Sequence, residues 1–224
     1  MIEAAGSAGV QLGIAYYRRF YPVLRRIAEL LRACAIGRPV LTQINAFEWF
    51  DPGSDHPRRW LLGRDRSGGG PMFDFGCHRI ELLTHLFGSV EQVRGLASQA
   101  LFKREVEDTA TALIRFTGGV QAVLSVTHAA RQPQDTLIIF GSAGTLEVPE
   151  LNAGTLVIRH SGGDRTENHP PHPNFHLPLI EDFVQAIFEG RTPAVDGHTG
   201  RETARAVEKI YLGAGITPVS GRVV

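Results

Sequence analysis

The spacing of apolar residues predicts several helices and one sheet. From Phe20 to Arg32 apolar side chains recur at helical spacing with arginines between them, until the Gly-Arg-Pro of residues 37–39 ends the pattern. Residues 40–47 alternate apolar and polar side chains, as a half-buried strand does. Three further helices are expected, at 74–87, 179–189 and 200–212.

Between the helices at 74–87 and 179–189 the pattern changes to short strands. Apolar and β-branched runs occur near 90–101, 109–117, 119–128, 135–140, 144–148 and 154–160. Turn sequences such as Thr117-Gly118-Gly119 separate them, and no helical pattern intervenes. Successive strands joined by short turns favour antiparallel pairing. The sequence therefore predicts an α+β fold, an open and predominantly antiparallel β-sheet with helices on one face.

The first residues are typical of the end of a larger structural unit. Residues 1–10 contain helix formers followed by Gly9, with no capping residue in front of them, as at the back end of a helix. Residues 11–16 form a short apolar run that suits a buried strand. We therefore expect a helix–strand remnant of an α/β domain. The alternative is a frayed N-terminal helix of a complete protein.

The charge and cysteine content exclude several classes of protein. Lys and Arg together equal Asp and Glu at 23 each, so no net field favours nucleic acid or an anionic membrane. The arginine pairs at 18–19 and 25–26 are expected to form a solvated face. Two cysteines occur without a CxxC spacing, and no apolar run approaches the roughly 20 residues of a membrane span. We expect a cytoplasmic protein that binds neither nucleic acid nor membrane.

The candidate chemistry is concentrated in the segment GGGPMFDFGCH of residues 68–78. In a helix, Asp74 and His78 project from one face, with Glu81 behind them. An imidazole beside a carboxylate can move a proton at neutral pH. The alternative is a helix-start acid next to a satisfied, half-buried histidine. The glycines before the helix and the long irregular segment 48–69 favour a functional site.

Two other groups of residues suggest functional roles. His169, His172 and His176 lie three and four residues apart among prolines, but no acid or cysteine cluster matches them, so no metal site is expected. Trp49 and Trp60 suit hydrophobic anchors as well as stacking on a sugar or a flat cofactor ring, and both alternatives stay open. No phosphate-binding glycine motif of the usual kinds occurs.

Motifs spread over nearly the whole chain form a recognisable set. They are GIAYYRRFYP at 13–22, GRP at 37–39, SGGGPMFDFGCHRIELL at 67–83, EDT at 107–109, FTGG at 116–119, GSAGTL at 141–146, FVQAIFEG at 183–190 and PAVDG at 193–197. This set resembles the C-terminal portion of the glucose–fructose oxidoreductase / inositol dehydrogenase family of nicotinamide-dependent oxidoreductases. The segment 68–78 is its most specific part.

The resemblance implies a domain organisation. Residues 1–17 would be the remnant of an N-terminal Rossmann domain that binds NAD or NADP. Residues 18–224 would be the C-terminal domain, which binds a sugar or polyol substrate and forms a homo-oligomer through its sheet.

The resemblance also implies roles for single residues. His78 would take the hydroxyl proton as hydride leaves the adjacent carbon, and Asp74 would orient the substrate. The other implied substrate contacts are Tyr17, Arg18, Trp60 and His176. Of these, Tyr17 and Trp60 would also lie near the nicotinamide.

The chain departs from the family pattern in two respects. The family's lysine in a Glu-Lys-Pro motif and its phosphate-binding unit have no counterpart here, and Leu61 stands where an arginine often follows the tryptophan matched by Trp60. The resemblance therefore implies the substrate-binding and oligomerisation half of an oxidoreductase. Two alternatives stay open. One is a non-catalytic sugar-binding or dimerisation module, and the other is a cofactor-free lyase or isomerase that uses Asp74 and His78.

Overall fold

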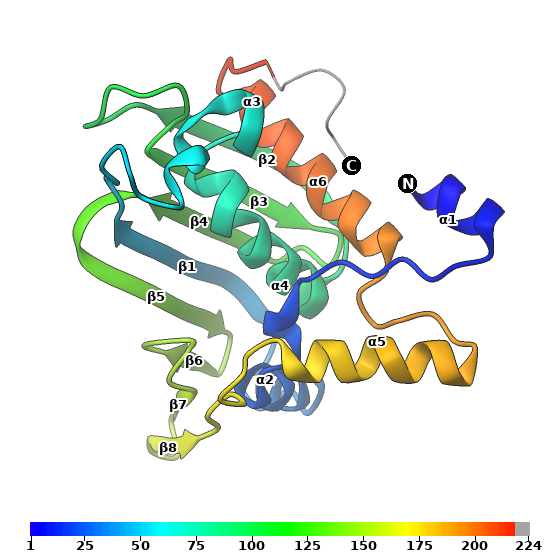
Figure 1. Cartoon of the computed structure of the whole chain (residues 1–224). Helices are drawn as coiled ribbons and strands as arrows, with labels where there is room; N and C mark the ends of the chain where they lie inside the picture. The colour runs from blue at the N-terminus through cyan, green and yellow to red at the C-terminus, as the bar shows by residue number, and fades with distance from the viewer. Residues whose placement is uncertain (218–224) are drawn as a thin grey trace.

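The sheet that the sequence predicts is present and has eight strands. A computed structural model describes residues 1–217, and Figure 1 shows its ribbon. The strands are β1 (Pro39–Trp49), β2 (Val90–Ser98), β3 (Thr109–Phe116), β4 (Gln121–Thr127), β5 (Ala129–Gly141), β6 (Gly144–Val148), β7 (Thr155–His160) and β8 (Arg165–Asn168). They lie side by side in the order β2-β3-β4-β1-β5-β6-β7-β8.

The sheet is mixed but mostly antiparallel. Of the strands in residues 1–217, β1 and β4 pair in parallel, in a register that joins Leu41 to Gln121 and Phe47 to Thr127, and the other strand pairs are antiparallel. This pairing is possible because the chain leaves the sheet after β1, forms helices and the β2–β3 hairpin, and then returns in the same direction. The predicted α+β class is confirmed. Strand β8 was not predicted, and β5 begins at Ala129 and not at residue 135.

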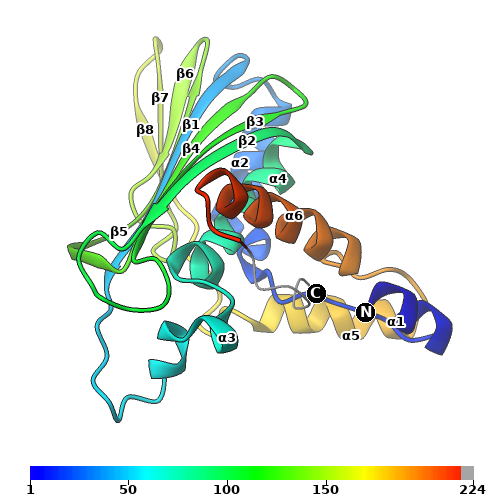
Figure 2. The ribbon, with the colours of Figure 1, turned by 90° about the horizontal axis from the view of Figure 1, so that it is seen from above.

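Helices cover one face of the sheet, as Figure 2 shows for α4 and α6. The helices are α1 (Ile2–Ala8), η1 (Tyr17–Phe20), α2 (Pro22–Arg32), η2 (Arg59–Leu62), α3 (Arg64–Ser67), η3 (Met72–Gly76), α4 (Cys77–Phe87), α5 (Leu177–Glu189) and α6 (Gly197–Gly213). Helix α6 lies directly on β2, where a Cβ at Gly95 would come within 2.4 Å of Ile210. None of the helices in residues 1–217 is long and apolar enough to cross a membrane.

The core lies between this face and the helices. Every second residue of the central strands points inward and is almost fully buried: Ile44 and Ala46 of β1, Leu124 and Val126 of β4, and Leu137 and Ile139 of β5. These rows pack against buried side chains of α2 and α4, including Leu24, Ile27, Ile80 and Leu83. The alternation seen in the sequence is therefore the alternation between core and outer face.

The outer face of the sheet exposes apolar side chains. Leu96 of β2 is 75% exposed and Leu113 of β3 is 59% exposed. The two are diagonal neighbours, because Leu96 pairs with Thr111 and Leu113 pairs with Arg94. Apolar side chains grouped on an exposed sheet face are typical of a surface on which another protein packs.

Residues 11–16 do not form the predicted strand. Within residues 1–217 this segment makes one isolated bridge, between Gly13 and Asp196. Its apolar side chains pack on α6 instead, since a Cβ at Gly197 would lie 2.7 Å from Leu12. In the described structure the apolar side chains of this segment therefore lie against a helix.

Candidate functional site

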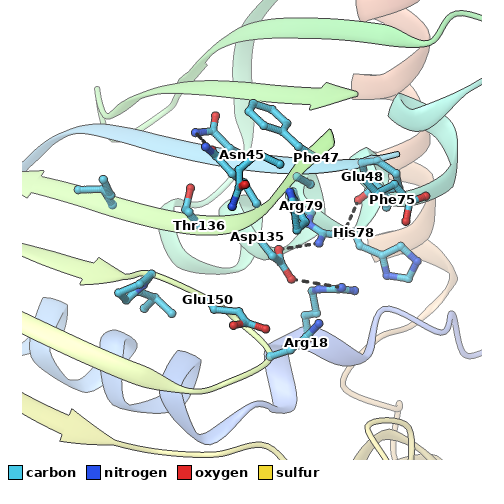
Figure 3. A pocket seen from close by; sticks show the side chains of 18 of the residues that line it. Arg18, Asn45, Phe47, Glu48, Phe75, His78, Arg79, Asp135, Thr136 and Glu150 are labelled. Atoms are coloured by element: carbon cyan, nitrogen blue, oxygen red, sulfur yellow. Dashed lines mark hydrogen bonds and ion pairs between the residues drawn. The ribbon is translucent and has the colours of Figure 1, made fainter. Parts of the chain in front are cut away.

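One cavity of about 910 Å³ collects most of the residues that the sequence singled out. Tyr17, Arg18, Asp74 and His78 all line it, together with polar residues of β1 and β5 (Figure 3). These side chains come from η1, from η3 and the first turn of α4, and from the sheet. The fold thus brings a phenol, a guanidinium, a carboxylate and an imidazole into one space.

The glycine-rich loop before α4 is held by a buried carboxylate. Glu107 accepts hydrogen bonds from the backbone N–H groups of Gly70 (2.8 Å) and Met72 (3.2 Å), and from the Tyr211 hydroxyl (2.7 Å). Glycine is required at position 70, because a Cβ there would lie 2.0 Å from the Glu107 carbonyl oxygen. Burial raises the pKa of Glu107, and these hydrogen bonds oppose that shift. This anchor fixes where the helix that carries the candidate residues begins.

The π-helical turn η3 gives Asp74 and His78 different neighbours. Asp74 Oδ2 lies 3.2 Å from Arg58 and 3.8 Å from Nε2 of His128. His78 lies in α4 and contacts the ring of Tyr17, with 5.5 Å between the ring centroids. Both side chains line the same cavity, but each meets a separate set of partners.

His78 is held in its neutral form. Burial, followed by the positive charges of Arg18 and Arg79, lowers the pKa of His78 to about 3. Tyr16 packs edge-on against its ring at 5.1 Å. The Nδ1 atom is buried and has no hydrogen-bond partner among residues 1–217. A neutral imidazole keeps a lone pair on one of its two nitrogens, which can accept a hydrogen bond or a proton.

Arg18 is buried and Arg19 is half-buried, so the expectation of a solvated face at 18–19 is wrong. Arg18 is 7% exposed, and Arg19 pairs with the buried carboxylate of Glu81. Both residues belong to the short helix η1, which turns them toward the sheet and α4. Arginines withdrawn from water require anionic partners, and here Glu81 of α4 pairs with Arg19 while Asp135 of β5 lies 3.9 Å from Arg18.

Arg18 and Arg79 share one carboxylate beside His78. Arg79 donates to Asp135 Oδ1 over 2.6 Å, and Arg18 Nη2 lies 3.9 Å from Asp135 Oδ2. Nη1 of Arg18 donates to the Tyr17 hydroxyl over 2.7 Å. The lining of the cavity therefore carries two buried cations against one buried anion at this end.

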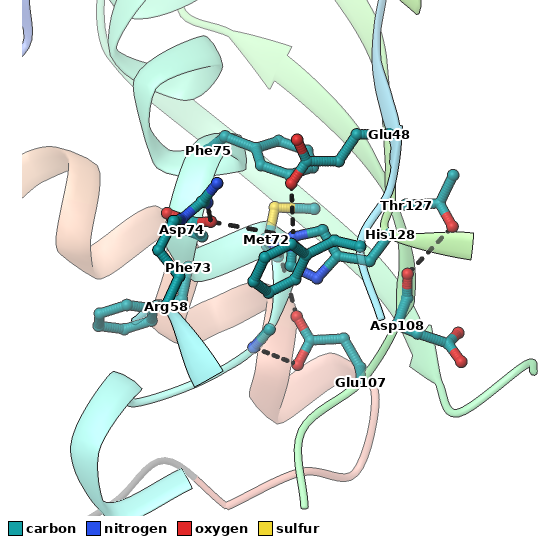
Figure 4. Close-up of polar contacts among 12 residues, drawn as sticks. Glu48, Arg58, Met72, Phe73, Asp74, Phe75, Glu107, Asp108, Thr127 and His128 are labelled. Carbon is teal, nitrogen blue, oxygen red and sulfur yellow. Dashed lines mark hydrogen bonds and ion pairs between the residues drawn. The ribbon is translucent and has the colours of Figure 1, made fainter. Parts of the chain in front are cut away.

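A second polar cluster, Glu48, Asp74 and His128, lies at the edge of the cavity, which Glu48 and Asp74 line (Figure 4). One ligand atom from each residue lies within 4.8 Å of the others, and His128 Nε2 is 3.4 Å from Glu48 Oε1. Burial raises the pKa of both carboxyl groups. Burial and the charge of Arg104 lower the pKa of His128 to about 3, so its ring is neutral.

The donor set of this cluster does not suit a metal ion. Arg104 Nη2 lies 3.1 Å from Nδ1 of His128. A guanidinium group can only donate, so Nδ1 accepts and the ring proton resides on Nε2. A protonated Nε2 has no lone pair for a metal ion, and it lies 3.4 Å from Glu48 Oε1 without a hydrogen bond between them.

The other two residues singled out as contacts lie outside the lining of this cavity. His176 precedes α5 and packs on the ring of Tyr17, with 4.4 Å between the centroids. Trp60 is 41% exposed and lines a different cavity of about 940 Å³, together with Phe102 and Arg104. His176 thus supports a residue of the site, and Trp60 belongs to a neighbouring surface. Their roles in ligand binding stay predictions.

Three residues of these clusters were not anticipated, although the sequence contains a signal for each. The inward row of β1 continues from Ile44 and Ala46 to Glu48, and that of β4 continues to His128. The inward row of β5 starts at Asp135, which pairs with Ala46. A polar side chain at the end of an alternating apolar row is buried by the same periodicity, so it needs a partner.

The fold and the cavity define the class to which this protein belongs. It is an α+β domain with an open sheet, and a polar cavity large enough for a small ligand lies at one end of the central strands. The family model described as GFO/IDH/MocA C-terminal domain matches residues 24–147, and the chain belongs to this family. The resemblance found in the motifs is thereby confirmed.

Known proteins are similar over nearly the whole chain. D-apiose dehydrogenase of Paraburkholderia graminis is 28% identical over 232 residues, covering 96% of this chain and 60% of that protein. An aldose–aldose oxidoreductase from Caulobacter crescentus, solved with glycerol, has the same fold with a TM-score of 0.84 at 24% identity. The match covers 96% of this chain and 64% of that one. Levoglucosan dehydrogenase, solved with NADH and levoglucosan, has a TM-score of 0.82 at 21% identity, and the match covers 95% of this chain and 66% of that one. The chain therefore spans about two thirds or less of these relatives.

Proposed function

We propose that this chain forms the substrate-binding part of an NAD- or NADP-dependent oxidoreductase that acts on a sugar, polyol or related hydroxy compound. The observation that carries the proposal is the single cavity lined by Tyr17, Arg18, Asp74 and His78. Sugar dehydrogenases among the relatives support the same class of substrate.

In this proposal His78 is the proton acceptor. The neutral imidazole has a lone pair for the proton of a substrate hydroxyl, and because its lowered pKa makes it a weak base, the proton is transferred as hydride leaves the same carbon. A bound nicotinamide supplies the hydride acceptor. The two guanidinium groups also favour the negative charge that develops on the substrate oxygen.

Asp74 orients the substrate in this proposal. Arg58, at 3.2 Å, opposes the effect of burial on the pKa of Asp74 and so favours the ionised carboxylate. An ionised carboxylate only accepts, so it binds hydroxyls next to the reacting one. We assign Tyr17 and Trp60 to the nicotinamide end, and His176 to the support of Tyr17 through their ring contact.

A combined binding and turnover assay tests the proposal. The chain is titrated with pentoses, hexitols and sugar acids while its NMR spectrum is followed, and each binder is then assayed for NAD- and NADP-linked oxidation. Asp74→Asn should weaken binding, and His78→Gln should abolish oxidation. His160→Asn, which changes an exposed histidine on β7, should leave both unchanged.

The outcomes separate the possible functions. Binding and oxidation that depend on Asp74 and His78 support the proposed function. Binding that depends on Asp74 without oxidation supports the substrate-binding part, and oxidation that depends on His78 excludes the alternative, a non-catalytic sugar-binding module. Absence of binding by every member of the panel contradicts both.

A further inference from the structure

We propose that Arg18 is the binding group for a ligand carboxylate, so that the substrate of this cavity is an acidic hydroxy compound such as a sugar acid. This inference rests on the proposed function, because it names the substrate class of the same cavity. Two observations carry it. One is the surplus of positive charge around Arg18, and the other is its unused hydrogen-bond donors.

The surplus of charge lies in the cluster of Arg18, Arg79 and Asp135. Their side chains are only 9%, 5% and 15% exposed. Oδ1 of Asp135 accepts a hydrogen bond of 2.6 Å from Arg79, whereas Oδ2 lies 3.9 Å from Arg18. After burial, the charge of Arg18 is the largest influence that lowers the pKa of Arg79, as expected for two repelling cations. An added anion beside Arg18 would balance this repulsion.

Arg18 also has donors that no residue in the described part of the chain satisfies. Its Nε is buried without a partner, and Nη2 is too far from Asp135 for a hydrogen bond. A buried N–H without an acceptor is costly, and a carboxylate can accept from two guanidinium N–H groups at once. Arg18 lines the cavity, and Figure 3 shows it extending from η1 toward Asp135.

The acidic residues of the cavity set the orientation of such a ligand. Glu147 is paired with Arg159, and Glu150 is exposed. Asp74 belongs to the separate cluster with Glu48 and His128. Carboxylates repel a ligand carboxylate and accept from ligand hydroxyls. A hydroxy acid therefore fits with its carboxylate on Arg18 and its hydroxyls toward Asp74.

This orientation also places the reacting group. Arg18 donates a hydrogen bond to the hydroxyl of Tyr17, and the ring of Tyr17 packs on His78 with 5.5 Å between the centroids, so Arg18 and His78 flank one residue of the cavity. A carboxylate bound to Arg18 would hold the hydroxyls on its nearest carbons close to the imidazole. We therefore expect the oxidised carbon to be near the carboxylate end of the substrate.

A matched pair of ligands tests the inference. D-gluconate and D-glucitol share the same polyhydroxy chain and differ in one terminal carbon, which is a carboxylate in the first and an alcohol in the second. In an NMR titration at constant ionic strength, D-gluconate should bind about tenfold more tightly or better. Arg18→Gln should remove this preference, and Arg18→Lys should keep part of it because the charge remains. Arg94→Gln, on the outer sheet face, is the control.

The variant is expected to fold. Arg18→Gln leaves Arg79 and Asp135 as a pair of one cation and one anion, so thermal unfolding without ligand should not occur at a much lower temperature. If Arg18→Gln does not fold, Arg18→Lys decides the question. It should weaken D-gluconate binding several-fold, since a lysine cannot form the bidentate contact, and leave D-glucitol binding unchanged.

Failure of this inference is distinguishable from failure of the proposed function. Equal binding of the two ligands, or a preference for D-gluconate that survives Arg18→Gln, overturns the carboxylate assignment and leaves a neutral sugar or polyol as the substrate. D-glucuronate and D-glucose provide a second matched pair. Absence of binding by all four ligands contradicts both the inference and the proposed function.

Discussion

The hydroxyl of Tyr211, near the end of α6, donates a hydrogen bond of 2.7 Å to the buried carboxylate of Glu107. The same carboxylate holds the backbone of Gly70 and Met72, so the last helix is tied to the loop that precedes the candidate site. This contact makes the position of α4 depend on residues far away in the sequence.

Substitutions at this anchor should lower stability. Tyr211→Phe removes one hydrogen-bond donor and should lower the free energy of unfolding by about 1 kcal/mol. Glu107→Gln replaces one accepting oxygen by an NH₂ group that cannot accept from the backbone N–H groups, and should lower the free energy of unfolding by about 2 kcal/mol. Urea unfolding measures both. Glu91→Gln, at an exposed pair with Arg115, is the control and should change stability by less than about 0.5 kcal/mol. If the free energies of unfolding of both anchor variants change as little as that of the control, Glu107 does not anchor the loop.

The tautomer of His128 is a second testable feature. Because Arg104 donates to Nδ1, we expect a neutral ring protonated at Nε2 in nitrogen-15 NMR spectra. Addition of zinc should leave its ring signals unchanged. In Arg104→Met the constraint on Nδ1 is gone, and a mixture of tautomers should form. A stoichiometric zinc-dependent shift of His128 in the wild-type chain would show instead that the cluster with Glu48 and Asp74 is a metal site.

Acidification should destabilise the fold through His78 and His128. Both have a folded-state pKa of about 3, against 6.5 for the free side chain. As the pH falls below 6.5, the unfolded chain binds protons that the folded chain does not, so stability decreases toward pH 3. Each histidine contributes up to about 1.4 kcal/mol per pH unit once the unfolded state is fully protonated.

The raised pKa values of Glu48, Asp74 and Glu107 act in the opposite direction. These carboxyl groups bind protons in the folded state at a higher pH than in the unfolded state. Comparison of the wild type with His78→Asn largely cancels their contribution. Urea unfolding between about pH 7 and about pH 5 should show a shallower loss of stability in His78→Asn. Identical slopes would mean that His78 binds protons equally in the folded and the unfolded chain, so that its pKa is not lowered.

The apolar outer face of the sheet should mediate self-association. Leu113→Glu places a charge among side chains that include Leu96, so a homo-oligomer built on this face should dissociate at concentrations at least about tenfold higher than for the wild type. Sedimentation velocity measures the change. Leu101→Glu alters an equally exposed leucine outside the strands and should have no effect. Association that is unchanged by Leu113→Glu would place the interface elsewhere.

The alternation of side chains in the sequence was enough to predict most strands and the fold class. Ile44 and Ala46 of β1, like Leu124 and Val126 of β4, face the core because successive strand residues point to opposite faces. The same local rule failed at residues 11–16. An apolar run is equally suited to a strand and to a segment that covers a helix, and α6 was available to be covered.

The sequence by itself thus determined the strand pattern, the family, and the presence of Asp74 and His78 in a glycine-led helix. Only the tertiary structure decided the partners of these residues. Arg18 is buried because Asp135, more than a hundred residues later, lies beside it, and Asp74 faces His128 because β4 returns parallel to β1. Burial and electrostatic shifts depend on distance in space, and the spacing of residues along the chain does not specify that distance.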